Sequence, residues 1–195
     1  NNVIVIGVLL FAQAFIGWDM VKSGLSDRVD VSQYRLALHL TMAFIILGLT
    51  FYTLVSYFYV NKLLNEDSVF IKKYKNLLII LFIFICFQIS YGAFVSGTHS
   101  GLIYNTWPLY NGNLFPYIEN TNIKGIINFF ENKEYIIFVH RTFAVLILLI
   151  LFYLNYLITI NRKQKSYYSV IVFFNITFVL QIILGVSMTY LNIPW

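Results

Sequence analysis

The 195-residue chain is 59% hydrophobic and only 11% charged, with a mean hydropathy of +0.76, and this composition excludes an ordinary soluble domain. Five apolar runs follow in chain order: residues 3–21, 36–60, 76–97, 136–160 and 167–191. Each is long enough to cross a bilayer as a helix, which takes about 20 residues. The runs are continuous rather than alternating, which argues against strands. We therefore predict an all-α integral membrane fold, because helices satisfy their backbone polar groups internally.

The net charge of +5 follows the predicted topology and does not indicate nucleic-acid binding. Segments 61–75 and 161–166 are rich in basic residues, whereas segments 22–35 and 98–135 hold few. By the positive-inside rule, the first pair faces the cytoplasm or matrix and the second pair faces outside. The second and fourth runs then both begin at the outer surface. The basic residues of the first pair are Lys62, Lys72, Lys73, Lys75, Arg162, Lys163 and Lys165.

Two histidines, each with a nearby arginine, lie near the start of these two runs. They are His39 with Arg35 and His140 with Arg141. Ionisable side chains inside a bilayer are costly and usually mark function, and a neutral imidazole is a good metal ligand. Arg35 precedes His39 by one helical turn on the same face, whereas adjacent residues such as His140 and Arg141 point to different faces. The pattern suits haem, whose iron takes imidazole ligands and whose propionates attract cations.

Each candidate also has a structural interpretation. His39 could be a core histidine bonded to a neighbouring helix, and Arg35 could be a snorkelling anchor. Arg141 could meet a neighbouring loop or a lipid phosphate, and His99, in an outside loop, is typical of a solvated histidine. Asp19, at the outer edge of the first run, is the only acidic residue within a run. The sequence therefore does not indicate a proton-handling carboxylate beside the metal.

The outer segment 98–135 is long and has no clear periodicity. Its aromatic stretches Tyr104–Pro108 and Leu114–Tyr117 are typical of the membrane interface, and they could also cover the edge of a cofactor. Helical spacing predicts a short surface helix through Ile123, Ile126, Ile127 and Phe130.

Small residues in the third run predict close helix packing. Gly92 and Ser96, and likewise Ala93 and Gly97, form small-x3-small pairs. The single cysteine, Cys86, lies in mid-run and cannot form an intramolecular disulfide. We interpret it as an apolar filler.

The first and last runs share a motif. Gln13, Gly17 and Met20 are spaced Q-x3-G-x2-M near the outer end of the first run. The same spacing recurs in the last run at Gln181, Gly185 and Met188. Membrane bundles are often built from repeats.

The repeat predicts where further histidines belong. His39 follows Met20 by 19 residues, and the same step from Met188 reaches about position 207. His140 precedes Met188 by 48 residues, and the same step before Met20 falls before the start. We expect two four-helix units, each with a histidine on its second and fourth helices.

On this interpretation the chain is a fragment of an eight-helix protein that lacks both ends, since it opens on Asn1 and stops just past the last run. Residues 1–75 would be the second half of the first unit, and residues 76–195 would be the first three helices of the second.

Several stretches resemble the haem A synthase family, in its mitochondrial and proteobacterial branch. They are GWDMVKSGLSDRVDVSQYRLALHL (Gly17–Leu40), GAFVSGTHSGLIYNTWPL (Gly92–Leu109), NFFEN (Asn128–Asn132), VHR (Val139–Arg141) and QIILGVSM (Gln181–Met188).

The resemblance implies an eight-helix membrane enzyme that oxidises a ring methyl of haem O to a formyl group, giving haem A for terminal oxidases. It implies haem b in the second unit and the substrate haem O in the first. His140 is similar to the first haem b ligand, and His39 to the second histidine of the substrate-side pair, which makes it the catalytic candidate. Arg35 and Arg141 are then cofactor-binding candidates. No role carries over to His99, where relatives tend to have an apolar residue.

The partner histidines and the family's glutamate would lie outside this chain, so the fragment alone is expected to be inactive. The branch lacks the paired loop cysteines of the other branch, in agreement with the lone Cys86.

The expected partners are haem O, the lipid bilayer, a haem O synthase, an unidentified electron acceptor and a second copy of the protein. The expected location is the bacterial inner membrane, or the mitochondrial inner membrane in a eukaryote. Two other functions stay open. One is a membrane b-type cytochrome that carries electrons without modifying its haem, and the other is a transporter or plain bundle with structural histidines.

Overall fold

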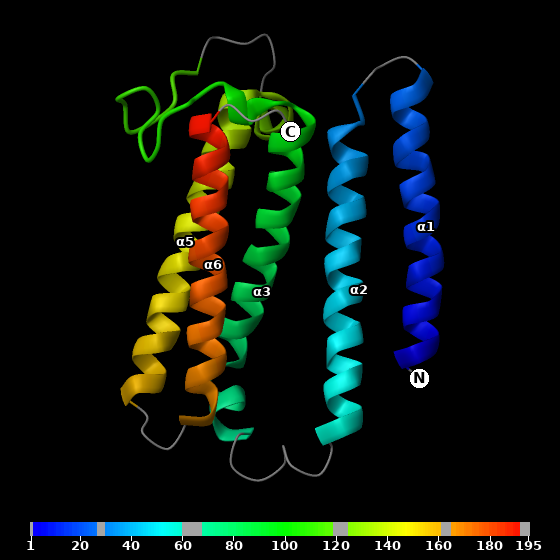
Figure 1. The fold of residues 1–195 in the computed structure, drawn as a ribbon, viewed down its shortest axis with the longest axis vertical. Coiled ribbons are helices and arrows are strands. Elements are labelled where there is room, and N and C mark those ends of the chain that lie inside the picture. The colour runs from blue at the N-terminus through cyan, green and yellow to red at the C-terminus, as the bar shows by residue number, and fades with distance from the viewer. Residues whose placement is uncertain (1, 27–29, 60–67, 119–124, 161–164, 192–195) are drawn as a thin grey trace. The chain divides into compact units, whose positions relative to one another are not determined.

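The computed structural model describes residues 2–26, 30–59, 68–118, 125–160 and 165–191 (Figure 1). Its long helices are α1 (Asn2–Ser26), α2 (Gln33–Tyr59), α3 (Ser68–Gly97), α5 (Lys133–Ile160) and α6 (Lys165–Leu191). All five are long and apolar enough to cross a membrane. The short helices are η1 (Ser100–Leu102), η2 (Gly125–Ile127) and α4 (Asn128–Glu131). The prediction of an all-α membrane protein is confirmed, with the five predicted spans found as candidate membrane helices among the described residues.

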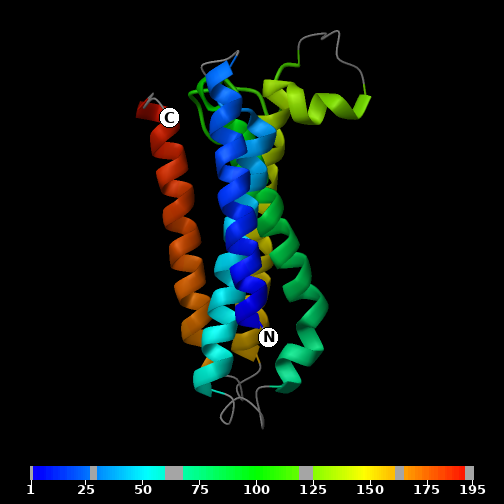
Figure 2. The same cartoon turned by 90° about the vertical axis from the view of Figure 1, so that its right-hand side faces the viewer.

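Every predicted run lies within one long helix, except that residue 60 falls outside the described residues. The largest difference is at α3, which begins at Ser68 rather than at residue 76. The prediction followed apolarity, whereas the helix continues through the basic stretch that contains Lys72, Lys73 and Lys75. At Tyr74 the backbone leaves helical geometry, with φ −108° and ψ 15°, and Figure 2 shows the change of direction in this part of α3. Lys62, Arg162 and Lys163, which support the predicted topology, lie outside the described residues.

The helices fall into two compact units, Asn1–Gly97 and Thr98–Trp195. In the first, α1 packs on α2 and α2 packs on α3, and in the second α5 packs on α6. Successive helices run antiparallel within each unit (Figure 1). The predicted boundary between repeats, at residues 75 and 76, is a different division of the chain and stays a prediction.

In the first unit, small residues bring α2 and α3 close together. A Cβ added at Gly97 would lie 2.9 Å from both the Cα and the Cβ of Gln33, and Ala93 is buried. One turn further into the bundle, the hydroxyls of Thr41 and Ser90 are 2.8 Å apart and share a hydrogen bond. The small-x3-small pair of Ala93 and Gly97 therefore serves helix packing, as the sequence predicts.

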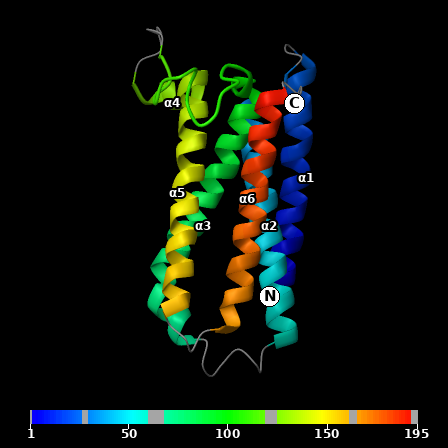
Figure 3. The same cartoon turned by 60° about the vertical axis from the view of Figure 1, so that its left-hand side comes forward.

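In the second unit, α5 has one buried stripe at helical spacing. It consists of Ile136, Ile137, Ile147, Leu151, Leu154 and Ile158. Figure 3 shows α4 and the preceding loop near the end at which α5 begins. At the start of α5, near His140 and Arg141, Ile137 is buried in a cluster with Tyr104 and Tyr110 of this loop.

Helices α1 and α6 have exposed apolar side chains on opposite sides. Val5, Leu10 and Phe11 of α1 are 50%, 52% and 81% exposed, and Phe174 and Val179 of α6 are 44% and 41% exposed. A helix that is apolar all round belongs in lipid or among other membrane helices. The exposed surface therefore agrees with a protein that spans a bilayer.

Candidate functional site

The first candidate site lies between α1 and α2, where His39 meets Gln13. The Nε2 atom of Gln13 is 3.1 Å from Nδ1 and 3.4 Å from Nε2 of the His39 ring. The same Nε2 donates to the backbone carbonyl of His39 at 3.0 Å. His39 is thus held by a neighbouring helix, as its structural interpretation expected, and that interpretation does not exclude ligation.

The contact with the backbone carbonyl fixes which way the Gln13 amide points. A carbonyl oxygen can only accept a hydrogen bond, so the amide atom facing it is the NH2 group, which has a second hydrogen for the ring. The amide oxygen, Oε1, is buried and has no hydrogen-bond partner in the described part of the chain. The side chain therefore retains an unused acceptor beside the imidazole.

Gly17, one turn along α1 from Gln13, leaves room for the His39 ring. A Cβ added at Gly17 would lie 2.9 Å from Cε1 and 3.4 Å from Nδ1 of His39. A larger residue here would displace the ring, because such a distance is shorter than a van der Waals contact. We call Gln13 and Gly17 together the imidazole socket.

Arg35 lies on the same seam between α1 and α2. Its Nε is 3.1 Å from Oδ2 of Asp19, and its Nη1 donates to the backbone carbonyl of Asp19 at 3.0 Å. The two side chains are 41% and 42% exposed. Arg35 is therefore more than a snorkelling anchor, since it pairs with a carboxylate while remaining accessible one turn from His39.

The second candidate site lies at the start of α5, around His140 and Arg141. Arg141 donates from Nη2 to the backbone carbonyl of Tyr104 at 3.2 Å. Its guanidinium carbon lies 4.8 Å from the centroid of the Tyr110 ring, which is a cation–π contact. Its Nη1 is buried with no hydrogen-bond partner among the described residues. Of the alternatives for Arg141, the contact with a neighbouring loop is the one observed.

The loop over Arg141 is well built, although its sequence has no clear periodicity. Tyr110 and Asn113 exchange backbone hydrogen bonds of 2.8 and 3.1 Å around a tight turn. The turn residues Asn111 and Gly112 have φ of 50° and 90°, conformations that Asn and Gly adopt most readily. Tyr104 packs edge-on against Tyr110 at 5.2 Å between ring centroids. The aromatic stretch thus covers a charged side chain.

Tyr104 and Tyr110 of this loop remain neutral near pH 7. Burial raises the pKa of the Tyr110 phenol, and the Arg141 guanidinium offsets part of that rise. Burial also raises the pKa of Tyr104, with a further contribution from the Glu134 carboxylate. Because neither phenol supplies a negative charge, these two rings do not neutralise Arg141. Its buried Nη1 can attract an anionic group.

The short surface helix predicted in this segment is present as η2 and α4, with Ile126 and Ile127 73% and 55% exposed. Ile123 lies outside the described residues. Their exposure agrees with an apolar face turned toward lipid.

Two further residues have no part in either site. His99 is exposed, with φ 54°, at the start of η1, which agrees with giving it no role. Cys86 has a free thiol within α3, and the Ser90 hydroxyl donates to its backbone carbonyl. Both are consistent with their structural interpretations.

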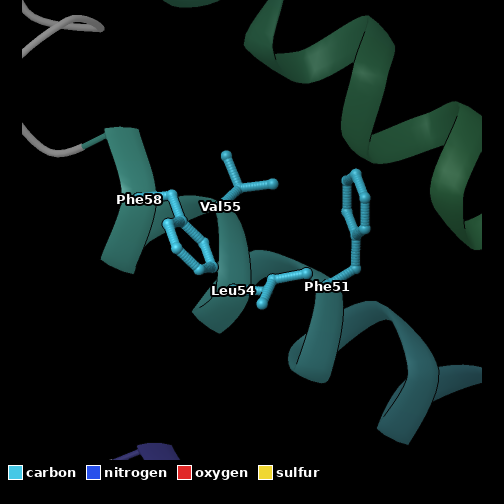
Figure 4. A pocket seen from close by; sticks show the side chains of 4 residues that line it. All are labelled: Phe51, Leu54, Val55 and Phe58. Atoms are coloured by element: carbon cyan, nitrogen blue, oxygen red, sulfur yellow. The ribbon is translucent and has the colours of Figure 1, made fainter.

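An open apolar pocket lies toward the end of α2, away from His39. Its lining consists of Phe51, Leu54, Val55 and Phe58, all on one face of α2 (Figure 4). It has no side chain that could bind a metal or a charged group. Among the described residues, no cluster of three or more His, Cys, Asp or Glu side chains could hold a metal ion. Each candidate site contains one of the two histidines that the sequence singles out, His39 or His140.

Comparison with known proteins identifies the family. The model of the COX15-CtaA family, described as cytochrome oxidase assembly protein, matches residues 1–195. The chain belongs to this family. The resemblance recognised in the sequence is thereby confirmed.

Curated relatives named heme A synthase match most of the chain. The protein from Wolbachia sp. subsp. Brugia malayi is 39% identical over 193 residues, covering 93% of this chain and 52% of the relative. The protein from Pelagibacter ubique is 37% identical and covers 91% and 50%, respectively. That from Wolbachia pipientis wMel is 40% identical and covers 95% and 51%. The chain spans about half the length of these relatives. No solved structure matches it.

The residues of this family member fit a haem at both sites. A haem needs an imidazole nitrogen, space beside the ring and cations for its propionates. Gly17 makes room for the His39 imidazole, Arg35 is a partly exposed cation one turn away, and Arg141 has a buried Nη1 without a hydrogen-bond partner among the described residues. The donor set therefore suits haem, with His39 and Arg35 in one unit and His140 and Arg141 in the other.

Sequence reasoning missed the partners of His39 and Arg35. Gln13 and Gly17 stood out only as a repeat and Asp19 only as a carboxylate at the outer edge of a run. The signal that could have found them is the short connection between α1 and α2, which makes the two helices pack antiparallel. Residues near the end of α1 must therefore face residues near the start of α2.

Proposed function

We propose that the protein containing this chain is a haem A synthase, an oxidoreductase that converts a ring methyl of haem O to the formyl group of haem A. Family membership and the names of the relatives support this activity. The observation that carries it is the His39 ring, held in the imidazole socket with an arginine one turn away. An imidazole oriented within a membrane helix is what an amphiphilic iron porphyrin requires.

On the substrate side, His39 is the proposed ligand and catalytic residue. Gln13 and Gly17 fix the position of its ring, and Arg35 is a cation at the outer end of the same helix face. Asp19 holds Arg35 in place while leaving its side chain accessible. These residues bind and orient haem O, whose iron supplies the redox chemistry when it is bound.

In the second unit, His140 is the proposed ligand of a resident haem b. Arg141 would bind a haem carboxylate through Nη1, because the contacts found for its side chain, with the Tyr104 carbonyl and with Tyr110, carry no negative charge. Tyr104 and Tyr110 shield this cation from water, which strengthens its attraction for an anion.

The family supports a multi-pass membrane location, and we propose the inner membrane of a bacterium or a mitochondrion. A haem O synthase would deliver the substrate, and an electron acceptor must remove the electrons. A second copy of the protein is a further proposed partner. The two four-helix units, with domains at residues 1–75 and 76–195, belong to the same proposal.

The test is to express the full-length protein with a haem O synthase in a host that lacks haem A synthase. We expect a Soret band and, after acid extraction and chromatography, both haem O and haem A. The His39→Ala variant is the matched control and should retain haem b without haem A. A protein that holds only haem b would instead be an electron-carrying cytochrome, and a colourless protein would be a plain bundle or transporter.

A further inference from the structure

We infer that Gln13 is a positioning residue for His39, and that the repeated Q-x3-G motif is a socket for a haem-ligating imidazole. The inference rests on the proposed function and assigns a role to residues outside the histidine and arginine pairs. Its observation is that the three atoms found within hydrogen-bond distance of the Gln13 amide nitrogen, two ring nitrogens and a backbone carbonyl oxygen, all belong to His39.

A general packing role for Gln13 explains this geometry less well. A primary amide inside a membrane helix is costly unless it is hydrogen-bonded, and Gln13 could have met any polar group on a neighbouring helix. It meets the ring and the backbone carbonyl of the one histidine on α2. Gly17 removes the side chain that would push the ring away. Both residues of the motif thus act on the same imidazole.

The requirements of a metal-binding histidine match what Gln13 offers. When one ring nitrogen binds a metal, the other carries a proton and donates it to an oxygen, which fixes the tautomer and the ring orientation. The Gln13 Oε1 is buried and unpaired among the described residues. On metal binding, a rotation of the amide would give up its hydrogen bond to the His39 carbonyl and present this oxygen to the ring N–H. Gln13 can therefore hold the ring before the metal binds and afterwards.

The copy of the motif on α6 has the same residues without an imidazole. Gln181 is exposed, and nothing lies within 4 Å of a Cβ added at Gly185. The repeat predicts a histidine at about position 207 on a following helix, and the relatives are about twice as long as the chain. The inferred occupant of this second socket is the imidazole of that histidine, which would be the partner of His140 on haem b.

The two copies make a crossed test possible in the full-length protein. The variants Gln13→Leu and Gln181→Leu remove the amide and retain an apolar side chain. Haem O binding is measured by Soret difference titration, and the haem b site by its content, its midpoint potential and the electron paramagnetic resonance of its ferric form. We expect Gln13→Leu to weaken His39-dependent haem O binding by about 10–100-fold and to leave haem b unchanged. Gln181→Leu should shift the potential and resonance of haem b and leave haem O binding unchanged.

Two further variants separate positioning from general stability. Gln13→Glu retains an oxygen acceptor and should restore haem O binding to near the wild-type level. Thr41→Val removes the hydrogen bond between α2 and α3 close to His39 without touching the ring, and should leave haem O binding within about twofold of wild type. Restored binding in Gln13→Glu supports positioning, because a purely steric role would not distinguish Glu from Leu.

The outcomes distinguish this inference from the proposed function. If the wild-type protein gives no His39-dependent titration, the proposed function fails and the inference falls with it. If the wild-type titration is present and Gln13→Leu does not change it, the inference alone is overturned. It is also overturned if both Leu variants alter both haems equally, because that result indicates a general effect on the bundle.

Discussion

The two histidine–arginine pairs look alike in sequence and differ in structure. Arg35 lies one turn before His39, so both face α1, where Arg35 pairs with Asp19. Arg141 adjoins His140 and turns instead toward a loop, where it contacts Tyr104 and Tyr110 and has a buried Nη1 without a partner in the described chain. Residues four positions apart lie on the same helix face, whereas adjacent residues point in different directions, so the two arginines reach different partners. The first cation is already balanced, and the second still requires an anion.

The largest expected effect is at His140. His140→Ala in the full-length protein should abolish the resident haem b, because it removes one of the two imidazoles proposed to hold the iron. Haem content by pyridine haemochrome measures the loss, and circular dichroism should show that the helices persist. A variant with normal haem b content would show that His140 is not a haem ligand and that the two histidines do not have comparable roles.

The next effect separates the two histidines. His39→Ala should leave haem b bound and reduce haem A production to background, because His39 belongs to the substrate side. Pigment chromatography of extracted membranes measures both haems in one sample. Continued formation of haem A would show that His39 is not at the active site.

The arginines should differ in the size of their effects. Arg141→Gln should weaken haem b binding by about 10–100-fold, since a buried charge-assisted hydrogen bond contributes about 1.5–3 kcal/mol. Arg35→Gln should weaken haem O binding by less than about tenfold, because its charge is partly exposed and already paired. Titration of each haem gives the two ratios. Equal ratios would mean that the pairing with Asp19 does not matter.

A smaller effect is expected in the loop over Arg141. Tyr110→Leu removes the cation–π contact, which contributes about 0.5–2 kcal/mol, and should lower the thermal midpoint of the full-length protein in detergent. Tyr117→Leu is the matched control, because Tyr117 is 77% exposed. If both variants have the same midpoint, the Arg141 contact does not stabilise the loop.

The smallest effect is expected at the exposed ion pair. Asp19→Asn should reduce stability by no more than about 1 kcal/mol, because both side chains are substantially exposed to solvent and salt. The comparison of thermal midpoints at low and high salt provides the measurement. A large, salt-independent loss would show that this pair is more important to the first unit than its exposure indicates.

Much of the fold could be predicted from local pattern. The five spans follow from apolar length alone, because a bilayer requires that length whatever the neighbours are. The start of α3 could not be predicted in this way, since a helix can continue past the apolar region into basic residues. The ordered turn around Asn111 and Gly112 also escaped prediction, because it depends on conformation rather than on periodicity.

The candidate ligands could be predicted from the sequence, but most of their partners could not. His39 and His140 stood out because ionisable groups in lipid are costly, and Arg35 because it lies on the same helix face. Gln13 and Asp19 became partners only in the structure, since contacts between helices depend on their rotation and register. The direction of the Arg141 side chain could not be predicted, because its contacts with Tyr104 and Tyr110 form only when the loop has folded.

The sequence by itself determined the membrane fold, the family and the identity of the candidate ligands, because hydrophobic length and rare residue types are properties of the chain. Only the tertiary structure decided which polar groups meet, namely Gln13 with His39, Asp19 with Arg35, and Tyr104 and Tyr110 with Arg141. The physical reason is that hydrogen bonds and ion pairs act over a few ångströms. Residues far apart in sequence reach that distance only after the helices have packed.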